Sequence, residues 1–420
     1  MLLCNGTFYG TLAAARALGR EGVPVTVADP KSSAPALWSR YVTRRLRCPD
    51  LEDVERFSEW LFRTGEREER HVLYATSDEL SFAIALHRDA LSERFALYQP
   101  DLETTMQILD KGVLNEHARA VGLDVPDTWL PESDADVTRA AREATGPLMV
   151  KPRTQVMFGV HAKGVIAEPG ADGLRTAYAH FTTGLHVHGA ALARRFPQAT
   201  RPMIQRYYSE ASDGIYSLAG FRDKSGKSFS VLGAKKLLQR PRRLGIGLCF
   251  EAAPVAPELA AGLKRLCERI GYYGVFEVEF IQAQGRSLLI DMNPRFYGQL
   301  GFEVARGLRL PQLAYAAALG QEDEVARLVA EVPPADDTSG VAYCNRFGLG
   351  VQVSAQRLAG TMKAEDAARW RVWLDAHEGK LVDAVADSND WRPYALEVAS
   401  QLYGHLRHPR VFLRKIVLDR

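Results

Sequence analysis

The sequence predicts an α/β domain at the N-terminus, followed by a strand-rich α+β region and a C-terminal extension. Three observations support this fold class. Residues 2–29 read as strand, helix and strand, the beginning of a parallel α/β sheet. From "GPLMVKPR" onward, short strand patterns replace the alternation of strands and helices. The length of 420 residues also exceeds one ordinary domain and is compatible with about three.

Composition indicates a globular soluble chain, with 46% hydrophobic residues, 25% charged residues and a formal net charge of +2. The near-neutral charge argues against a nucleic-acid partner or a membrane-surface protein, and no apolar run reaches transmembrane length. The start "MLLCNGTFYG" lacks the basic and long apolar segments of a signal peptide. Five cysteines are scattered without a CxxC pair, which argues against a disulfide framework or a cysteine zinc site. We therefore expect a cytoplasmic protein.

The first domain is expected to repeat strand–helix units. "MLLCNG" and "VPVTVAD" are its first strands, with the alanine-rich helix "TLAAARALGREG" between them. The strand "HVLYATSDE" lies between the helices "VERFSEWLFRTG" and "LSFAIALHRDAL". Open α/β sheets bind ligands at the carboxyl ends of their strands, and roles as turns and helix caps are an equal alternative for polar residues there. The polar residues at this edge are Asn5, Thr7, Thr76, Ser77, Asp78 and Glu79.

A boundary is expected near Leu109, after which strands dominate. A helix-rich insertion interrupts them at roughly residues 172–196. "PELAAGLKRLCERIGY" predicts a helix that ends at Gly271. After it, "GVFEVEF" and "SLLIDMNP" read as two strands joined by a turn at "AQGR". Beyond Gly320 helices and short strands return, with a loop or linker at "VPPADDTSG".

The basic C-terminal tail carries an apolar stripe, although Pro409 must break or kink a helix there. Such a helix either packs its stripe on its own protein, which we favour, or binds a membrane surface. The apolar residues are Leu402, Leu406, Val411, Phe412 and Ile416, and the basic ones are Arg407, Arg410, Arg414 and Lys415.

An acid, an amide and an arginine alternate at the end of the apolar stretch "LLIDMNPR". Asp291, Asn293 and Arg295 share one face of this strand, because alternate strand residues point to the same side. The preceding strand "FEVEF" places Glu277 and Glu279 on one face. Carboxylate and amide oxygens are ligands that Mg²⁺ prefers, and an arginine forks onto phosphate or carboxylate. The pattern predicts a metal that binds phosphates, and a polar strand end with surface salt bridges is the alternative.

Basic residues elsewhere fit the same chemistry. Lys111 stands at a helix start, and Lys151 ends the apolar strand "PLMVKP", where it is well placed for a phosphate. "PMIQRYY" runs from a strand into irregular chain, whose backbone groups suit an adenine ring. Arginines and lysines crowd "KKLLQRPRRLGIG"; the near-neutral total charge favours a local anion site over an extended nucleic-acid surface.

The order of Lys111, then Lys151 in "VKP", then "QRYY", "FEVEF" and "DMNPR" resembles the ATP-grasp superfamily. It is most similar to the carboxylate–amine ligase branch that includes D-aspartate ligase. The resemblance covers residues 1 to about 320. The segments "RALGREGVPVTVAD", "WSRYV" and "TSDE" resemble the Rossmann-like preATP-grasp domain of that branch.

The resemblance implies a preATP-grasp domain, an ATP-grasp fold of two subdomains and a C-terminal extension. The expected boundaries are residues 1–108 for the preATP-grasp α/β domain, 109–320 for the ATP-grasp domain (subdomains of about 109–205 and 206–320) and 321–420 for the α/β extension.

The resemblance also implies roles for single residues. Those implied to bind ATP are Lys111 and Lys151 at the phosphates, Gln205 and Arg206 through backbone atoms at the adenine with Tyr208 beside them, and Asp213 at the ribose. The implied metal ligands are Glu279, Asp291 and Asn293, which would hold two Mg²⁺ ions, with Mn²⁺ as a possible substitute, while a metal role for Glu277 is open. The implied catalytic residues are Arg295 at the transferring phosphoryl group, with Lys236, Arg240 and Arg243 near the γ-phosphate or an acidic substrate.

The sequence departs from the family pattern in three places. Asp291 stands where the family usually has a glutamate, so the metal or the strand must lie closer. The loop "PRTQVMFGVHAKG" is poor in glycine, although such loops usually cradle phosphates with backbone N–H groups. "HFTTGLHVHGAALARRFPQ" resembles an insertion. Its His186 and His188 have zinc-ligand spacing but no further ligand nearby, so ordinary surface histidines are favoured.

The implied activity is an ATP-dependent ligase that phosphorylates a small carboxylate substrate, such as an amino acid, and passes the acyl group to an amine. A covering loop would protect the acyl phosphate from water. No nucleophile elbow is present, which argues against covalent catalysis by the protein. The alternatives are a carboxylase-like or kinase-like ATP-grasp enzyme and a non-catalytic nucleotide-binding protein. A homodimer is left open.

Overall fold

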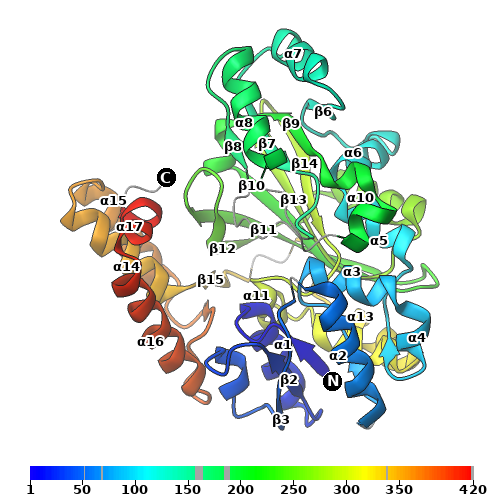
Figure 1. The fold of residues 1–420 in the computed structure, drawn as a ribbon. Helices are drawn as coiled ribbons and strands as arrows, with labels where there is room; N and C mark the ends of the chain where they lie inside the picture. The colour runs from blue at the N-terminus through cyan, green and yellow to red at the C-terminus, as the bar shows by residue number, and fades with distance from the viewer. Residues whose placement is uncertain (52, 68–69, 157–163, 184–189, 337–338, 418–420) are drawn as a thin grey trace.

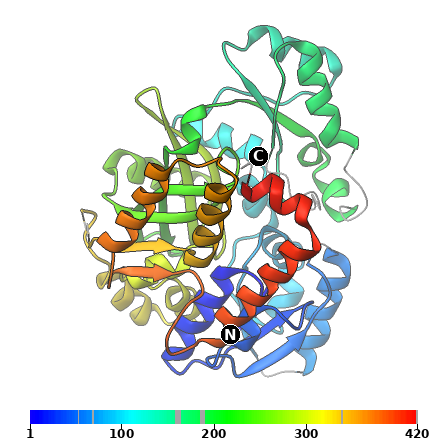
Figure 2. The same ribbon diagram turned by 90° about the vertical axis from the view of Figure 1, so that its left-hand side faces the viewer.

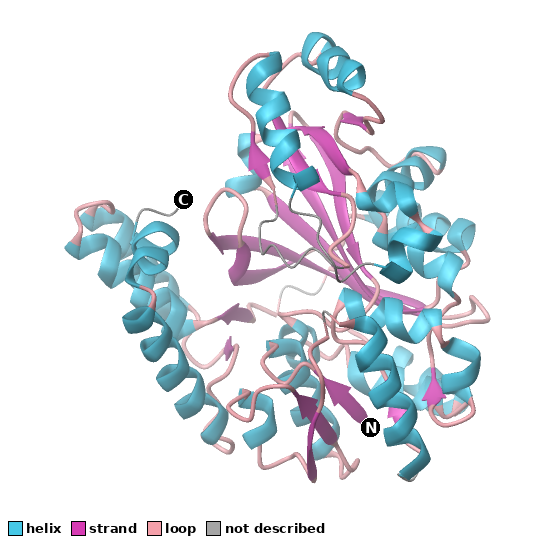
Figure 3. Ribbon diagram, in the orientation of Figure 1, coloured by secondary structure: helices cyan, strands magenta, loops and turns pink. Residues whose placement is uncertain are grey.

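Three β-sheets surrounded by helices make up the described part of the computed structural model of the chain (Figure 3). The structure describes residues 1–420 except 52, 68–69, 157–163, 184–189, 337–338 and 418–420. Figure 1 shows the sheet near the N-terminus at the bottom, the large sheet in the centre and the small sheet at the top.

The first sheet is parallel and has the strand order β3-β2-β1-β4-β5. Its strands are β1 (Leu2–Cys4), β2 (Thr26–Asp29), β3 (Arg44–Arg47), β4 (Val72–Leu73) and β5 (Ala96–Leu97). The helices between them are α1 (Tyr9–Arg20), α2 (Val54–Arg67), α3 (Asp78–Leu86) and α4 (Arg88–Ser92), with a short 3-10 helix η1 (Pro35–Trp38). The predicted parallel α/β start is therefore confirmed. The strand expected in "HVLYATSDE" is only two residues long, so its polar end is loop and helix start.

A helical break fixes the position of Lys111. The segment after Pro100 forms two helices, α5 (Leu102–Leu109) and α6 (Lys111–Ala120). Asp110 separates them because its carboxylate accepts hydrogen bonds from the backbone N–H of Gly112 at 2.9 Å and of Val113 at 3.4 Å. Lys111 is thus the first residue of α6, at a helix start as predicted.

The small sheet is antiparallel, with the order β6-β9-β7-β8. Its strands are β6 (Thr128–Trp129), β7 (Leu148–Pro152), β8 (Val165–Ile166) and β9 (Pro202–Arg206). Its helices are α7 (Asp134–Glu143), α8 (Ala171–Thr183), α9 (Ala190–Arg195) and the 3-10 helix η2 (Pro197–Thr200). The helix-rich insertion is therefore present as α8 and α9. His186 and His188 lie outside the described residues.

The large sheet has the order β14-β13-β10-β11-β12-β15-β16, antiparallel except for the parallel pair β15–β16. Its first strands are β10 (Ile215–Arg222), β11 (Phe229–Arg240), β12 (Ile246–Ala253), β13 (Gly274–Ala283) and β14 (Arg286–Asn293). The 3-10 helix η3 (Ser209–Ser212) precedes it, and α10 (Pro257–Ile270) covers it. Gly271 ends α10 with φ of +77°, a left-handed conformation that favours glycine. The predicted helix end and hairpin are confirmed.

The last quarter of the chain joins the other parts rather than forming a sheet of its own. Helices α11 (Leu300–Ala305), α12 (Leu310–Ala318) and α13 (Glu322–Ala330) follow the large sheet, and one hydrophobic cluster includes residues of α1, α11, α12 and α13. β15 (Ala342–Cys344) pairs with β12, and β16 (Leu381–Asp383) pairs with β15. The remaining helices are α14 (Arg346–Leu358), α15 (Ala364–Ala376), α16 (Arg392–Arg407) and α17 (Pro409–Phe412), ending in a π-helical turn at Leu413–Val417. The domain boundaries given above stay a prediction.

The apolar residues of the C-terminal tail do not all pack on the protein, which was the interpretation that we favoured. Leu402, Leu406 and Val411 are 49%, 82% and 47% exposed, whereas Ile416 is buried. The chain changes its neighbours at Pro409, because α16 packs against η1 whereas the turn at Leu413–Val417 packs against α14. Within the described residues, no helix is both long and apolar enough to cross a membrane.

Candidate functional site

The hairpin of β13 and β14 sets the acidic residues of the site opposite one another. In its register Glu277 pairs with Asn293, and Glu279 pairs with Asp291. Directly opposed residues of an antiparallel pair project to the same face. The alternation read from the sequence therefore places these four polar side chains together on one face of the large sheet.

A lysine from a different element contacts each of the two outer carboxylates. Lys111, the first residue of α6, forms an ion pair with Asp291, and Lys236, in β11, forms an ion pair with Glu279. Both lysines are buried, at 7% and 5% exposure. A buried ammonium needs a compensating charge. The two lysines and two carboxylates therefore form a compact polar cluster where helix α6 and the large sheet meet.

Glu277 holds the neighbouring amide in place. Its two carboxylate oxygens accept hydrogen bonds from Asn293 Nδ2 at 2.7 Å and from Gln299 Nε2 at 3.0 Å. The side chain is buried, and burial together with the nearby negative charge of Glu279 raises the pKa of Glu277 to about 7. Glu277 therefore holds the Asn293 amide in place.

Arg295 connects the hairpin to the first sheet. Its guanidinium donates to Asp78 Oδ1 at 2.5 Å and to Asn293 Oδ1 at 2.8 Å. Asp78 begins α3 and belongs to the polar edge predicted from the sequence. The backbone N–H of Phe296 also donates to the carbonyl of Ala75 at 3.1 Å. The predicted edge and the predicted hairpin thus meet, although nothing in the sequence pattern indicated this pairing.

Sequence reasoning missed Asp110 and Arg153. The Arg153 guanidinium donates to both oxygens of Asp110, at 2.8 and 2.7 Å, and both side chains are buried. The backbone N–H of Lys111 donates to the carbonyl of Arg153 at 2.9 Å. These bonds fix the start of α6 against the end of β7, where Lys151 stands with 9% of its surface exposed. The capping position of Asp110 before Lys111 was the one available signal.

The residues predicted at the adenine are partly engaged within the fold. Gln205 Nε2 donates to Thr128 Oγ1 at 3.1 Å, and the backbone N–H of Arg206 donates to the carbonyl of Asp127 at 2.9 Å. Tyr208 is buried, with the Arg206 guanidinium 5.0 Å from its ring centroid. The roles of these residues stay predictions, and for Arg206 the remaining backbone group is its carbonyl.

The remaining predicted site residues, Asp213, Arg240 and Arg243, lie apart from one another. Asp213 forms an ion pair with Arg242 at 2.8 Å, and both side chains are more than half exposed. Arg243 is exposed as well. Arg240 ends β11, and its positive charge acts on Tyr9 of α1 and on His405 of α16. Arg240 therefore lies toward the C-terminal helices rather than in the lysine–carboxylate cluster.

The donor set at the hairpin fits Mg²⁺. Among the described residues, no three His, Cys, Asp or Glu side chains gather closely enough to form a metal site by themselves. Mg²⁺, however, is usually bound by one or two carboxylates together with waters and substrate phosphates. Glu279 and Asp291 could supply the carboxylates, Asn293 an amide oxygen, and Lys111 and Lys236 positive charge for phosphates. The set suits a metal that arrives with a nucleotide.

Two hollows of the surface lie away from the hairpin. A cavity of about 890 Å³ opens between the end of α1 and helices α12 and α13, with Glu21, Gln312 and Arg327 among its lining residues. A smaller one of about 320 Å³ lies beside Asp213 and Lys235. Neither contains the hairpin carboxylates, so charge and register, rather than cavity size, identify the candidate site.

Comparison with known proteins finds similarity in structure. No protein-family model matches the chain, and no curated protein matches it in sequence. The biotin carboxylase domain of the Hydrogenobacter thermophilus 2-oxoglutarate carboxylase, solved with MgADP, ADP and bicarbonate, is 17% identical, with a TM-score of 0.57 over 76% of this chain and 69% of that one.

Two further solved structures show the same similarity. The L-amino acid ligase from Bacillus licheniformis is 15% identical, with a TM-score of 0.56 over 76% of this chain and 73% of that one. The N5-carboxyaminoimidazole synthetase from Staphylococcus aureus is 14% identical, with a TM-score of 0.53 over 76% of each chain. The mixed α/β architecture is thus shared with these enzymes, and the ATP-grasp fold that the sequence resemblance implied is confirmed.

Proposed function

We propose that this chain, which has the ATP-grasp fold, is an ATP-dependent carboxylate–amine ligase that forms an amide bond and releases ADP and phosphate. The observation that carries the proposal is the hairpin register, which opposes Glu279 to Asp291 and sets a lysine on each. Carboxylates for a metal and cations for phosphates in one cluster are what phosphoryl transfer requires. The similar solved structures, which include an amino acid ligase and a carboxylase with bound MgADP, support it.

The residues of the cluster divide the work of binding. Glu279, Asp291 and Asn293 would hold Mg²⁺, which when bound offsets the charge of the phosphates. Lys111 would contact the phosphates once the nucleotide competes with Asp291 for it, because an ion pair between side chains is exchanged readily for one with a phosphate. Lys151, at the end of β7, would contact the phosphates as well. Glu277 keeps Asn293 oriented through its 2.7 Å hydrogen bond. Nucleotide binding would therefore replace the lysine–carboxylate pairs rather than require a new cavity.

The chemistry proceeds in two displacements. An oxygen of the substrate carboxylate attacks the γ-phosphorus of ATP, the bond to the β–γ bridging oxygen breaks, and ADP leaves. Arg295, held between Asp78 and Asn293, would stabilise the acyl phosphate that forms. The amine nitrogen then attacks the acyl carbon, loses a proton, and expels inorganic phosphate. The product is an amide.

The test is a screen of amino acids and small carboxylic acids for ADP release by the full chain, with and without an amine. Hydroxylamine is the probe for the intermediate, because it converts an acyl phosphate to a hydroxamate. We expect hydroxamate only when ATP, Mg²⁺ and the correct acid are present. ADP release by wild type but no hydroxamate with any acid would exclude the acyl phosphate. Absence of ADP release with every acid would contradict the ligase proposal.

A carboxylase activity is the second candidate, because the TM-score to the carboxylase domain, 0.57, is as high as that to the amino acid ligase, 0.56. Bicarbonate would then replace the carboxylic acid as the group that is phosphorylated. Isotopically labelled bicarbonate in the same screen separates the two. Incorporation of the label into product favours the carboxylase, and bicarbonate-independent turnover of an amino acid favours the ligase.

A further inference from the structure

The C-terminal helix α16 has two unlike sides. Its inner side packs on the protein, where Pro393 and Glu397 are buried. Glu397 Oε1 accepts hydrogen bonds from the Tyr9 hydroxyl of α1 at 2.7 Å and from Gln401 Nε2 at 2.6 Å. Residues three or four positions apart lie on the same side of a helix. Pro393, Glu397 and Gln401 follow this spacing and define the inner side of α16.

The outer side of α16 is apolar and exposed. Trp391, just before the helix, is 64% exposed, Leu402 is 49% exposed and Leu406 is 82% exposed. Ala395 and Ala399 lie between them in the sequence and are exposed as well. These five residues, which we call the outer stripe, again follow a spacing of three or four and therefore share one side of the helix. Figure 2 shows α16 (orange-red to red) on the face of the molecule turned to the viewer.

The tail is held to the protein on both sides of the outer stripe. Before α16, Asp390 accepts a hydrogen bond from Arg16 Nε of α1 at 2.9 Å, and both side chains are buried. After α17, Gln356 Nε2 of α14 donates to the carbonyl of Ile416 at 2.8 Å, and Ile416 is buried. The outer stripe could turn inward only by breaking such buried contacts. Its exposure is therefore a built feature of a fixed helix.

The exposed charge around the outer stripe is positive. Between residues 391 and 417 the only acidic residue is Glu397, which lies on the buried inner side. Arg392, Arg407 and Arg410 are exposed. The formal net charge of +2, from which we expected no membrane-surface protein, is a sum over the whole chain and does not show this local excess. The outer side of the tail thus combines an apolar stripe with basic residues.

Exposed aromatic and aliphatic side chains lie toward both ends of this surface. Trp391 stands at its start, and Tyr403, which is 62% exposed, accepts a hydrogen bond on its hydroxyl from Arg407 Nη1 at 3.1 Å. Val411 and Leu413, beyond the helix, are 47% and 51% exposed. Tryptophan, tyrosine and arginine each join an apolar body to a polar end, which suits them to the boundary between lipid headgroups and acyl chains.

Charge distinguishes between the surfaces that could cover the outer stripe. A two-fold contact with a second copy of the chain, centred on Ala399, would set Arg392 of one copy near Arg407 of the other. Like charges that face each other across an interface are unfavourable. An anionic lipid surface, in contrast, accepts apolar side chains and attracts the arginines around them. Charge complementarity therefore favours anionic lipid.

We propose that α16 lies on an anionic lipid surface, with the outer stripe at the boundary between headgroups and acyl chains. The guanidinium groups of Arg392, Arg407 and Arg410 then contact the lipid phosphates. One helix side and a few arginines give a reversible, peripheral association. This inference goes beyond the proposed function and does not depend on it, because no residue of the candidate site belongs to the outer stripe.

The test is sedimentation of the full chain with lipid vesicles. One set contains phosphatidylcholine alone, and the other contains equal amounts of phosphatidylcholine and phosphatidylglycerol. We expect wild type to sediment with the anionic vesicles, to stay in solution with the neutral ones, and to be released by high salt because salt screens the attraction. Leu406→Glu places a negative charge in the outer stripe and should weaken binding at least about 10-fold. Arg410→Gln should weaken it about fivefold, as for the loss of one basic residue near the surface.

Matched controls carry the same changes at exposed positions outside the tail. Leu319→Glu alters a leucine that is 44% exposed at the end of α12, and Arg369→Gln alters an exposed arginine of α15. Both control variants should bind anionic vesicles as wild type does. The melting temperature of Leu406→Glu should match that of wild type, because the leucine side chain is 82% exposed.

Three results would overturn the proposal. Wild type could stay in solution with anionic vesicles, or a folded Leu406→Glu could sediment as wild type does. Equal binding of wild type to neutral and anionic vesicles would contradict the role of the arginines. Analytical ultracentrifugation without lipid tests the alternative of a second copy. A dimer that Leu406→Glu dissociates, together with no binding to vesicles, would assign the outer stripe to a contact between two chains.

Discussion

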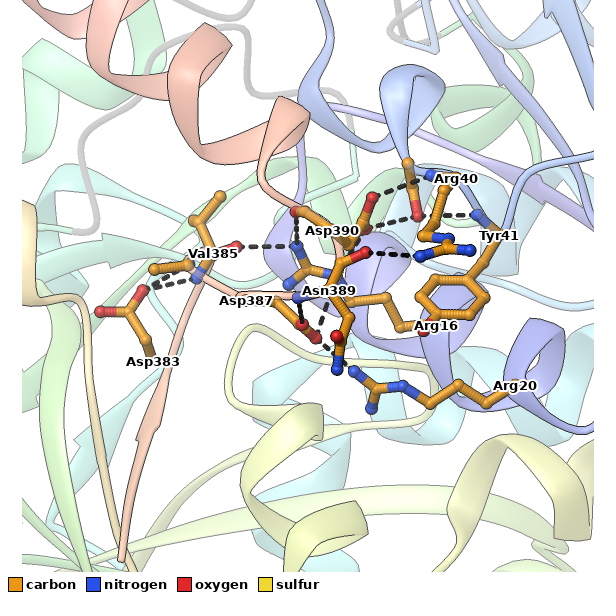
Figure 4. A network of polar contacts seen from close by, with 11 residues as sticks. Arg16, Arg20, Arg40, Tyr41, Asp383, Val385, Asp387, Asn389 and Asp390 are labelled. Carbon is orange, nitrogen blue, oxygen red and sulfur yellow. Dashed lines mark hydrogen bonds and ion pairs between the residues drawn. The ribbon is translucent and has the colours of Figure 1, made fainter. Parts of the chain in front are cut away.

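Two buried charge clusters in this molecule are built in opposite ways. At the hairpin, Lys111 and Lys236 each contact one carboxylate, and the side chains of Asp291 and Glu279 keep 27% and 17% of their surface exposed. At the anchor of the extension (residues 383–390), the Asp390 side chain is 1% exposed. Its oxygens accept from Arg16 Nε at 2.9 Å, Ser39 Oγ at 2.7 Å and the backbone N–H of Arg40 at 2.8 Å, as Figure 4 shows.

The remaining donors of the anchor are engaged in the same manner. Arg16 also donates to the carbonyls of Val385 and Asp390, at 2.8 and 3.0 Å, and Arg20 forms an ion pair with Asp387 (Figure 4). Three donors therefore share the two oxygens of a carboxylate that is almost fully buried, which leaves little access for a ligand. The open hairpin cluster holds its charges with flexible lysines that a metal and phosphates can displace. The comparison indicates that the anchor supports structure and the hairpin supports function.

The largest expected effect is on turnover at the hairpin. Asp291→Asn removes one negative charge from the implied metal ligands, and ADP release should fall about 10²- to 10⁴-fold because the metal supplies several kcal/mol of transition-state stabilisation. The free energy of unfolding should fall by less than in the anchor variant below, because the amide oxygen that replaces the carboxylate still accepts a hydrogen bond from the buried Lys111. Asp291→Glu restores the charge and should retain most activity. Wild-type rates in Asp291→Asn would place the metal elsewhere.

A substitution in the anchor should lower the stability of the protein and leave nucleotide binding unchanged. Asp390→Ala leaves the buried Arg16 guanidinium with only the carboxylate of Asp387, at 4.0 Å, and the free energy of unfolding should fall by about 3–5 kcal/mol. Urea denaturation of the full chain measures this loss. Nucleotide affinity at low temperature, where the variant is folded, should match wild type. Glu378→Gln, at an exposed position, should leave both quantities unchanged, and a similar loss there would show that the extension is generally sensitive.

An effect of intermediate size is expected for a substitution at Lys151. Lys151→Ala should weaken ATP binding about 10- to 100-fold by removing a charge-assisted contact to phosphate, without a comparable loss of stability. Isothermal calorimetry with ATP and Mg²⁺ gives the affinity, and a thermal melt gives the stability. If the melting temperature falls while the affinity holds, the lysine belongs with the structural charges of the anchor.

The smallest expected effect is on the pH dependence of the free energy of unfolding, to which Glu277 contributes. Its pKa is raised from 4.5 to about 7 by burial and by Glu279, so the folded state binds this proton more tightly than the unfolded state. The resulting stabilisation is present at acidic pH and is lost as the pH rises from about 4.5 to about 7. Over this pH interval, the free energy of unfolding of Glu277→Gln should decrease by at least about 1 kcal/mol less than that of wild type. Urea titrations across the interval measure it, and parallel slopes for both proteins would refute the shifted pKa.

Much of the local structure could be predicted from the sequence alone. The alternation in "FEVEF" and "LLIDMNP", with the turn "AQGR" between them, determined that Glu279 and Asp291 belong to one hairpin. Gly271 marked the end of α10, and Lys111 stood at a helix start. Side-chain periodicity, turn residues and helix caps act over a few residues, so they can be predicted from residues that are close together in the sequence.

Only the tertiary structure decided which distant charges meet. Lys111 and Asp291 are 180 positions apart, Arg295 and Asp78 are 217 apart, and Tyr9 and Glu397 are 388 apart. The tail stripe was predicted correctly as helical, yet its packing was wrong for Leu402 and Leu406. Periodicity states which side chains share a face, but the partner of that face depends on how sheets and helices stack. That stacking depends on the apolar surface that the whole chain buries. The sequence of a single segment does not show which other segment it will bury that surface against.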